Sequence, residues 1–400
     1  CEAVDTGKKI RIVGDYDIDG VCSTYILLQA FERLGSDVDF EIPDRIKDGY
    51  GINESIIEQA HADGVEVILT CDNGISAFHQ VELAKKYGMT VVITDHHEVP
   101  LDGEKEKIPP ADAVIDPKQA DCPYPFPEIC GAVVAYKLVQ VLYARRGVPQ
   151  MEWLDLLEFA AIATVGDVMK LQDENRILVK YGLKKMAQTK NLGLRRLAEK
   201  NNLDLGAITA YHIGFVIGPC LNAGGRLKTA KEALALLRAQ SEEEAERLAE
   251  ELKELNDTRK DMTEQGTEAA KLQVESWYQK DKVLVVFLPE CHESLAGIIA
   301  GRLREYYQKP AIVLTRGEEA VKGSGRSIDE YHMFKKLTEV SDLLLKFGGH
   351  PLAAGLSLEE KNIDEFRRRL NENAGLTEED FKAKVWIDVP MPVGYVTERL

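Results

Sequence analysis

The chain has 400 residues, of which 44% are hydrophobic and 29% charged, and its formal net charge is -17. This length and composition favour an ordinary globular protein of two or three packed domains. The 7 cysteines include no Cys-x-x-Cys pair, which argues against a disulfide framework or a thiolate zinc site and fits a reducing compartment. No apolar stretch approaches the roughly 20 residues that span a bilayer, and no signal-peptide pattern is present. We therefore expect a cytoplasmic protein with no membrane partner.

The net charge of -17 argues by itself against a polyanionic partner, because nucleic-acid binding usually requires a basic surface. Two features weaken this argument. Part of the acidity is concentrated in residues 241–254, and carboxylates that hold divalent cations are neutralised in the loaded protein. The charge therefore does not decide whether the partner is a nucleic acid.

The first half of the chain alternates short β-branched runs with amphipathic stretches, which is typical of a parallel sheet covered by helices. The expected buried strands are residues 10–14, 38–42, 67–70, 91–94 and 113–115. Residues 21–34 and 77–87 are expected helices, each followed by a glycine stop. This order predicts a doubly wound α/β domain.

The second half begins with a helical pattern from residue 154 to about 186, and residues 241 to about 280 form one long charged helix pattern. Ser241 and Glu244 form a capping box at its start. At about 1.5 Å per residue, the long helix would span on the order of 55 Å. The pattern fits a solvated surface helix and a helix that bridges two domains equally well.

A second, smaller α/β domain is expected after the long helix, from about residue 282. Residues 283–287 and 311–314 have strand patterns, with a helix pattern at 296–307 between them. A strand-like stretch at 385–390 follows, too short to bury a core of its own. It looks like the beginning of a further domain.

Three aspartates, Asp15, Asp17 and Asp19, follow the first predicted strand at alternate positions and precede a glycine. The spacing imitates the start of an EF-hand calcium loop. However, position twelve of such a loop would be Ile26 and not the required Glu, and a strand, not a helix, precedes it. A site for another metal at the carboxyl end of a strand is the better interpretation.

Acidic and imidazole groups also follow two further predicted strands. Asp72 comes after the third strand, and Asp95, His96 and His97 come after the fourth. Neighbouring parallel strands place such groups at one edge of the sheet, where open α/β folds bind ligands. Taken alone, Asp72 fits a helix cap and the two histidines fit satisfied surface residues; their joint occurrence favours a metal site.

A fourth candidate, Asp167, lies in the apolar, small-residue stretch 163–168. Burying a lone carboxylate there would cost several kcal/mol unless a cation or a donor compensates, and the metal site supplies that compensation. Oxygen ligands with a single imidazole suit Mg²⁺ or Mn²⁺ better than zinc, and the carboxylates suffice for two ions.

The motifs DYDIDG, TCDNGIS, DHH and TVGDV, in this order and at these intervals, resemble the DHH phosphoesterase superfamily. Further blocks, which extend over nearly the whole chain, narrow the resemblance to the RecJ family, exonucleases of single-stranded DNA. They are PDRIKDGYG at 43–51, CGAVVAYKL at 130–138, ENR at 174–176, GPCLNAGGRL at 218–227, KGSGRS at 322–327 and FGGHPLAAG at 347–355.

The resemblance implies four parts of the chain. They are a DHH catalytic domain at 1–190, a helical connector with a long bridging helix at 191–281, a DHH-associated substrate-binding domain at 282–375, and the start of an OB-type domain at 376–400. The expected fold is thus a parallel-sheet α/β domain joined by a long helix to a smaller α/β domain, with a cleft between them.

The family's site residues carry over motif by motif. The resemblance implies that two ions, Mn²⁺ or Mg²⁺, are held by Asp17, Asp19, Asp72, His96 and Asp167. Asp72 would bridge the ions, and His97 would lie against the scissile phosphate or the leaving oxygen, so that Asp72, His96, His97 and Asp167 form the catalytic set. Asp95 would orient this set from outside it; for Asp15, an orienting role and a ligand role are equally open.

The resemblance also implies a set of substrate-phosphate contacts. They are Asn222 and Arg226 in the connector, and Ser324, Arg326 and His350 in the second domain. The planar guanidinium of arginine binds phosphate bidentately, and the glycines of GSGRS and GGH let backbone amides approach phosphate oxygens.

Two positions depart from the family pattern. Cys220 stands where the family usually has Arg, and Cys291 stands where it usually has Trp. Loss of a cation could weaken a DNA phosphate contact, and loss of an aromatic ring could remove a stacking group. We expect these changes to affect substrate affinity and length preference, and not hydrolysis.

These features predict a metal-dependent 5′-to-3′ exonuclease that hydrolyses single-stranded DNA to 5′-mononucleotides in DNA repair and recombination. Two cations roughly 3.5–4 Å apart can activate water and neutralise the attacking and leaving oxygens. The partners implied are single-stranded DNA, a single-strand-binding protein and a helicase, and we expect a monomer.

Two alternatives remain. One is a phosphodiesterase of short RNA oligonucleotides, cyclic dinucleotides or inorganic polyphosphate, against which the block NAGGR and the long helix favour the exonuclease. The other is a non-catalytic scaffold, which the retention of all the implied metal ligands disfavours.

Overall fold

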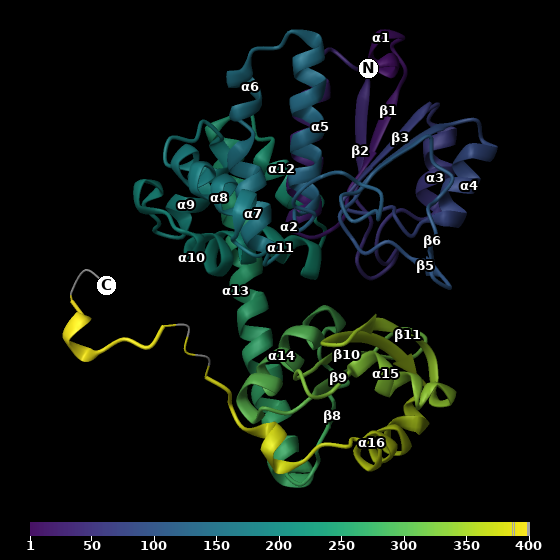
Figure 1. Ribbon diagram of the computed structural model, residues 1–400, viewed down its shortest axis with the longest axis vertical. Helices are drawn as coiled ribbons and strands as arrows, with labels where there is room; N and C mark the ends of the chain where they lie inside the picture. Colours follow the sequence, from purple (N-terminus) through teal and green to yellow (C-terminus); the bar gives the residue numbers. More distant parts are fainter. Residues whose placement is uncertain (386, 388, 398–400) are drawn as a thin grey trace. The chain divides into compact units, whose positions relative to one another are not determined.

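The computed structural model describes residues 1–385, 387 and 389–397. The chain divides into two compact units, Cys1–Arg259 and Lys260–Leu400. Each unit has its own five-stranded sheet, and Figure 1 shows the elements of both.

The sheet of the first unit is entirely parallel, in the order β2-β1-β3-β4-β7. Its strands are β1 (Ile10–Val13), β2 (Val38–Glu41), β3 (Val67–Cys71), β4 (Thr90–Thr94) and β7 (Ala113–Ile115). The five predicted strands of the first half are therefore confirmed, each end within one residue. This order places β1, β3 and β4 side by side, so that the segments following them meet at one edge.

Helices cover both faces of this sheet, as Figure 1 shows for α5 on one side and for α3 and α4 on the other. The helices are α2 (Ile18–Arg33), α5 (Gly131–Arg146) and α7 (Leu157–Gly166) on the first face, and α3 (Glu54–Ala62) and α4 (Phe78–Lys86) on the second. Side chains alternate between the faces along each strand: Ile12 packs with α2 and α5, while Val13 packs with α3 and α4. Since both faces are filled with apolar side chains, polar groups gather at the carboxyl edge.

Short helices complete the first unit. They are α1 (Glu2–Asp5), α6 (Gln150–Leu154), α8 (Asp173–Met186), α9 (Leu192–Lys200), α10 (Ala210–His212), α11 (Gly218–Leu227) and α12 (Lys231–Leu237), with a π-helix at Ile213–Ile217 and a small hairpin of β5 (Leu101–Asp102) and β6 (Lys105–Glu106). The helical pattern predicted for 154–186 is confirmed as α7 and α8, but the helix is interrupted directly after Gly166.

The long predicted helix is α13 (Glu242–Gln273), which continues as a π-helix at Val274–Tyr278. The chain passes from the first unit to the second within α13, so the bridging interpretation is confirmed over that of a surface helix. Leu248 and Leu252 pack in the core of the first unit, and Ala270 packs in the core of the second. At its start, Glu244 N donates to Ser241 Oγ over 3.2 Å, which is one bond of the predicted capping box. The Glu244 carboxylate accepts from the backbone N of Gln240, over 3.0 Å.

The second unit has a mixed sheet in the order β11-β12-β10-β9-β8. The strands are β8 (Leu284–Phe287), β9 (Ala311–Arg316), β10 (Val321–Arg326), β11 (Leu344–His350) and β12 (Ala353–Leu358), and only the pair β8–β9 is parallel. One face packs on α14 (Ala296–Tyr307) and the end of α13, and the other packs on α15 (Met333–Thr338) and α16 (Ile363–Glu372).

The predicted elements β8, β9 and α14 are confirmed, but β10, β11 and β12 were not predicted. Their blocks KGSGRS and FGGH are rich in glycine, which is depleted in strands, so local propensity gave no indication of these strands. The strand-like stretch 385–390 includes residues 386 and 388, which lie outside the described residues. The expected OB-type start at 376–400 stays a prediction.

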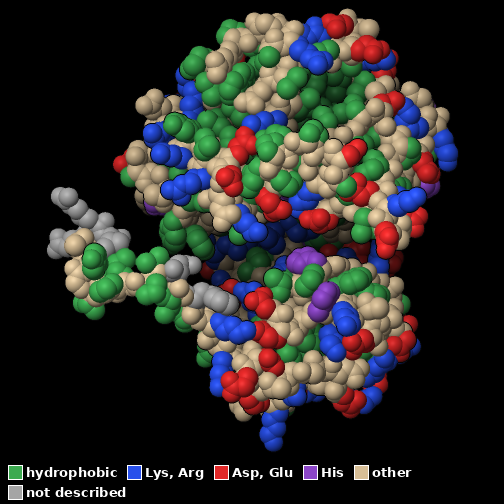
Figure 2. Space-filling model, viewed as in Figure 1, with side chains coloured by type: hydrophobic (Ala, Val, Ile, Leu, Met, Phe, Trp, Pro, Cys, Tyr) green, Lys and Arg blue, Asp and Glu red, His purple; other side chains and the backbone are tan. Residues whose placement is uncertain are grey.

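Among the residues that the structure describes, no helix is long and apolar enough to cross a membrane. The negative net charge is not spread as a uniformly acidic surface: in the view of Figure 2, Lys and Arg side chains are interspersed with Asp and Glu on each unit.

Candidate metal centre

The first carboxylates of the site lie at the junction of β1 and α2. Helix α2 begins at Ile18, three residues before the predicted start, because Asp17 caps it. Asp17 Oδ1 accepts hydrogen bonds from the backbone N of Asp19 at 2.9 Å and of Gly20 at 3.1 Å, an N-cap that stabilises a helix by about 1 kcal/mol. The cap uses only Oδ1, so Oδ2 of Asp17 remains available to bind a cation.

Asp19 is held by the N-terminus of α5. Its Oδ2 accepts from Gly131 N and its Oδ1 from Ala132 N, each over 2.7 Å. The side chain is only 1% exposed, and a helix N-terminus is a favourable place for a buried anion. Because each carboxylate oxygen has a further lone pair, Asp19 can bind a cation while these bonds persist.

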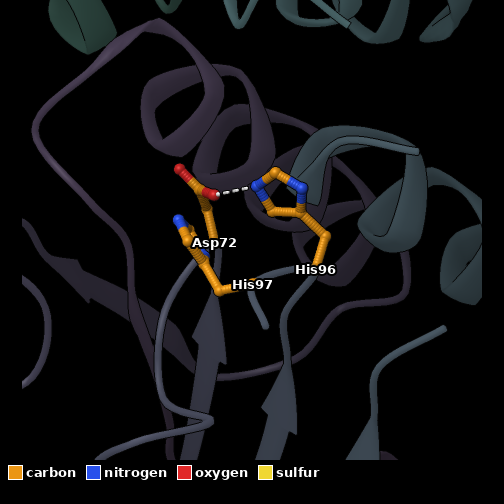
Figure 3. Close-up of side chains that lie close together, drawn as sticks. All are labelled: Asp72, His96 and His97. Atoms are coloured by element: carbon orange, nitrogen blue, oxygen red, sulfur yellow. Dashed lines mark ion pairs between the residues drawn. The ribbon is translucent and has the colours of Figure 1, made fainter. Parts of the chain in front are cut away.

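Asp72 follows β3 in a strained backbone conformation. Its φ is 61°, a left-handed value that non-glycine residues rarely adopt and that often marks functional sites. The Tyr50 hydroxyl donates to the Asp72 carbonyl oxygen over 2.9 Å. Figure 3 shows the Asp72 carboxylate facing the His96 ring, with Oδ1 3.1 Å from Nε2.

His96 is the common neighbour of three carboxylates. Its Nε2 lies 3.4 Å from Asp19 Oδ2, 3.1 Å from Asp72 Oδ1 and 3.8 Å from Asp167 Oδ2. Burial lowers the pKa of His96 below its ordinary value, although the charge of Asp19 acts to raise it. The ring is therefore neutral near pH 7, which is the form that binds metals.

His97 is oriented by Asp95. Its Nδ1 lies 2.7 Å from Asp95 Oδ1, and although burial acts to lower the pKa of His97, the Asp95 carboxylate outweighs it and raises the pKa to about 9. Asp95 also accepts from the backbone N of His96 and of Ile75. Oδ1 of Asp95 thus orients the histidine segment, while Oδ2 binds the backbone of the segment after β3.

Asp167 lies at the C-cap of α7, where the helix is interrupted. Its side chain is 31% exposed, so the carboxylate is only partly buried, because the helix ends at this residue and turns its side chain out of the apolar stretch. Burial and the charges of Asp19 and Asp17 still raise the pKa of Asp167 to about 8.

These residues converge. Three groups could each hold a metal ion, with their candidate ligand atoms within 4.8 Å of one another: Asp72, His96 and His97; Asp19, His96 and Asp167; Asp15, Asp17 and Asp72. The structure therefore brings Asp17, Asp19, Asp72, His96 and Asp167 together, and it places Asp15 and His97 beside them.

The chemistry of the cluster fits divalent cations. Among the described residues, Asp15 Oδ1, Asp72 Oδ1 and His96 Nδ1 are buried without a hydrogen-bond partner. Burial, followed by repulsion from neighbouring carboxylates, raises the pKa of Asp17 and of Asp72 and raises that of Asp15 to about 8. Such groups ionise together only when cations compensate, and oxygen donors with one imidazole suit Mg²⁺ or Mn²⁺.

Sequence reasoning missed residues that shape the site. Tyr50 contacts both Asp72 and His97, with its hydroxyl 3.1 Å from His97 Nδ1. The buried Asn73 side chain donates to Val13 O and accepts from Ile52 N, so it ties β1 to the loop that carries Tyr50. Each lies inside a motif, DGYG or TCDNGIS, but no local pattern indicated these long-range contacts.

The implied phosphate contacts of the first unit lie next to the cluster. Asn222 and Arg226 are on α11, and a Cβ at Gly225 of this helix would lie 2.3 Å from the carbonyl oxygen of Tyr16. Arg45 lies over the Tyr16 ring at 3.9 Å and donates to Gly225 O. Helix α11 thus packs directly against the β1–α2 segment.

The implied contacts of the second unit lie at one end of its sheet. Ser324 and Arg326 are on β10, with Arg326 Nη1 donating to Ser324 Oγ over 3.2 Å. Arg326 on β10 and His350 on β11 both pair with Ala353 of β12, so they flank the same residue of the strand that lies between β10 and β11. Burial lowers the pKa of Arg326 below its ordinary value.

The two departures from the family pattern have different surroundings. Cys220 is fully buried in α11, with its Sγ 3.4 Å from Nδ2 of Asn256. Cys291 is partly buried beside Gly266, where a Cβ would lie 3.5 Å from its Sγ. The effect of either residue on substrate affinity stays a prediction.

A parallel sheet with carboxylates and histidines at its carboxyl edge, followed by a long helix and a mixed-sheet unit, defines a two-domain protein of the DHH class. Residues 9–164 match the DHH family, N-terminal domain, and residues 280–375 match the DHHA1 domain.

Several curated relatives are single-stranded-DNA-specific exonucleases named RecJ. The Bacillus subtilis protein is 40% identical over 400 residues, which cover 99% of this chain and 50% of that protein. The Dickeya dadantii protein is 36% identical over 97% of this chain and 70% of its own length. The chain thus spans 50% of the length of the Bacillus subtilis protein and 70% of the length of the Dickeya dadantii protein.

Two solved RecJ structures are similar to this chain in fold. The Thermus thermophilus RecJ structure in complex with Mn²⁺ has a TM-score of 0.80 and 32% identity, over 93% of this chain and 53% of that one. A structure of exonuclease RecJ bound to manganese has a TM-score of 0.81 and 33% identity, over 95% and 93%. The chain belongs to the RecJ family.

Proposed function

We propose that this protein is a metal-dependent exonuclease that hydrolyses single-stranded DNA from the 5′ end to 5′-mononucleotides, in DNA repair and recombination. The observation that carries the proposal is the convergence of three carboxylate and histidine groups around Asp72 and His96. The curated names of the relatives, single-stranded-DNA-specific exonucleases, support the substrate.

Asp17, Asp19, Asp72, His96 and Asp167 would hold two ions of Mn²⁺ or Mg²⁺. Such ions, when bound, activate water and neutralise charge on a phosphate ester. Asp72 belongs to two of the three groups, which suits a ligand shared between sites. Asp15 lies in one group, and its unpartnered Oδ1 favours a ligand role over the orienting role.

His97 would protonate the leaving oxygen. Its raised pKa of about 9 keeps the ring protonated near neutral pH, and Asp95 and Tyr50 hold it beside the cluster. A positioned acid of this kind contributes about 10²–10⁴-fold to a rate.

The phosphates of the DNA would be bound by Asn222 and Arg226 of the first unit and by Ser324, Arg326 and His350 of the second. The four-part division at 190, 281 and 375 belongs to the same proposal. The cytoplasmic location, the monomeric state and the protein partners stay predictions.

Digestion of end-labelled single-stranded oligonucleotides of graded length, with Mn²⁺, tests this function. We expect stepwise release of 5′-mononucleotides from the 5′ end, no activity in EDTA, and protection of duplex DNA. Degradation confined to dinucleotides, short RNA or cyclic dinucleotides would instead support the alternative phosphodiesterase. Full activity in EDTA would contradict both.

A further inference from the structure

The first unit contains a cavity of about 400 Å³ that shares no lining residue with the metal centre. Its walls come from the C-terminal half of α2, the first turn of α7, the segment between α8 and α9, and the end of α12. This volume is in the range of small-molecule sites, which combine apolar walls with a few polar groups.

A buried carboxyl lies in the wall of this cavity. Glu158 is 3% exposed; its Oε1 accepts from Thr189 Oγ1 over 2.6 Å, while its Oε2 is buried without a hydrogen-bond partner. Leaving such an oxygen unpaired costs the free energy of its desolvation. Burial accordingly raises the pKa of Glu158 to about 7. A ligand that offers N–H donors to this carboxyl would remove the penalty.

The mouth of the cavity has an excess of cations. Arg33, Lys185, Lys190 and Arg238, from four different elements, line it together with the carboxylates of Glu152 and Asp155. Arg33 pairs at 2.5 Å with Glu152, which also lines the cavity. Arg238 pairs at 2.6 Å with Glu32, which does not line it.

Asp155 forms ion pairs with both lysines of the mouth. It pairs with Lys185, and its Oδ2 lies 3.9 Å from the Nζ of Lys190, whose side chain is 87% exposed. One carboxylate cannot neutralise two ammonium groups, so the remaining positive charge of the lysines would attract an anionic group at the mouth.

The ligand must therefore combine N–H donors at one end with an anion at the other. Guanine carries two adjacent donor groups on one edge, which match the two acceptor oxygens of a carboxylate, and the phosphate of a guanine nucleotide supplies the anion. Tyr25 and Phe159, whose ring centroids lie 4.3 Å apart, also line the cavity and contribute apolar wall.

We propose that this cavity binds a guanine nucleotide, with the base edge on Glu158 and the phosphate at Arg33, Lys190 and Arg238. The site is separate from the metal centre along α7: Glu158 is in its first turn and Asp167 at its C-cap. At about 1.5 Å per residue, these positions are roughly 13 Å apart. The proposal does not depend on the proposed nuclease activity.

Calorimetric titration of the full chain with GMP, IMP and AMP, in EDTA at pH 8, tests the proposal. This pH is above the Glu158 pKa of about 7, so the ionised carboxylate can accept from two donors. We expect one saturable GMP site per chain, with IMP bound more weakly and AMP weakest, because they offer fewer donors on that edge. Glu158→Gln keeps the size of the side chain but replaces one acceptor oxygen with a donor, and should weaken GMP binding at least tenfold. Arg238→Gln should weaken all three nucleotides alike.

Two controls separate this site from others. Arg247→Gln removes an exposed arginine of α13 that pairs with Glu251 and should leave GMP affinity within twofold. Asp72→Asn alters the metal centre and should do the same. Absence of binding at millimolar GMP, unchanged affinity in a folded Glu158→Gln variant, or loss of binding in Asp72→Asn would each overturn the proposal.

Discussion

Gly131 and Asp72 lie so close together that a Cβ at position 131 would be 2.7 Å from Cβ and 2.9 Å from Oδ1 of Asp72. The same glycine donates its backbone N–H to Asp19. The start of α5 thus holds two of the proposed metal ligands at once, and it can do so only without a side chain.

Gly131→Ala should therefore disrupt the site. The added methyl group must displace Asp72, which should lower the free energy of unfolding by about 1–3 kcal/mol and nuclease activity by more than tenfold. Chemical denaturation and a nuclease assay measure the two effects. Gly301→Ala on α14, where a Cβ meets nothing within 4 Å, is the matched control and should be neutral or stabilising. Wild-type activity in Gly131→Ala would refute the packing argument.

Metal ions should stabilise the folded protein. A ligand at 100 times its Kd raises the free energy of unfolding by about 2.7 kcal/mol, so MnCl₂ should raise the Tm of the wild type. Asp72→Ala should abolish turnover and most of this shift. Asp112→Ala removes a carboxylate that pairs with Lys85 and should keep both. A full Mn²⁺ response in Asp72→Ala would exclude Asp72 as a ligand.

Tyr50→Phe should reduce the rate of hydrolysis with only a small loss of folding stability. Loss of the hydroxyl that contacts the Asp72 carbonyl and His97 should reduce kcat roughly tenfold, while the free energy of unfolding falls by only about 1 kcal/mol. Steady-state kinetics and thermal denaturation report the two. Tyr87→Phe, on a ring that stacks on His61, is the control. An unchanged kcat would remove Tyr50 from the site.

Arg326→Gln should weaken DNA binding without changing sequence preference. If Arg326 binds a phosphate, the slope of log affinity against log salt concentration should fall by about one. Fluorescence anisotropy at several salt concentrations measures this slope. Arg316→Gln, which loses an exposed pair with Glu360, should leave it unchanged; equal slopes in wild type and Arg326→Gln would contradict the phosphate contact.

Glu158 should make the protein less stable as the pH rises. Burial raises its pKa from 4.5 to about 7 in the folded state, so the folded protein prefers the protonated carboxyl. The associated stability is present below pH 4.5 and is lost as the pH rises to about 7, to a total of about 3 kcal/mol. In urea denaturation, the free energy of unfolding of Glu158→Gln should therefore rise relative to that of the wild type between pH 5 and pH 8. A constant difference would show that Glu158 does not titrate in this range.

The pattern of the first half predicted its sheet well. Runs of β-branched residues marked β1, β3 and β4, and the acidic and histidine residues directly after them had to meet at one edge, because parallel neighbours share their carboxyl ends. Four of the proposed metal ligands, Asp17, Asp19, Asp72 and His96, were therefore accessible from local sequence, whereas Asp167 follows a helix. Glycine-rich β10 and β11 were not accessible in this way, since their strand conformation depends on pairing with β12 and not on local propensity.

Sequence by itself determined the strands of the first sheet and which residue types gather at its edge, because the hydrophobic periodicity of each strand is a property of consecutive residues. Only the tertiary structure decided the exposure of Asp167, the contacts of Tyr50 and Gly131, and the unpaired carboxyl of Glu158 in its cavity. The physical reason is that burial, close approach and hydrogen-bond pairing arise between segments distant along the chain, where local patterns carry no information.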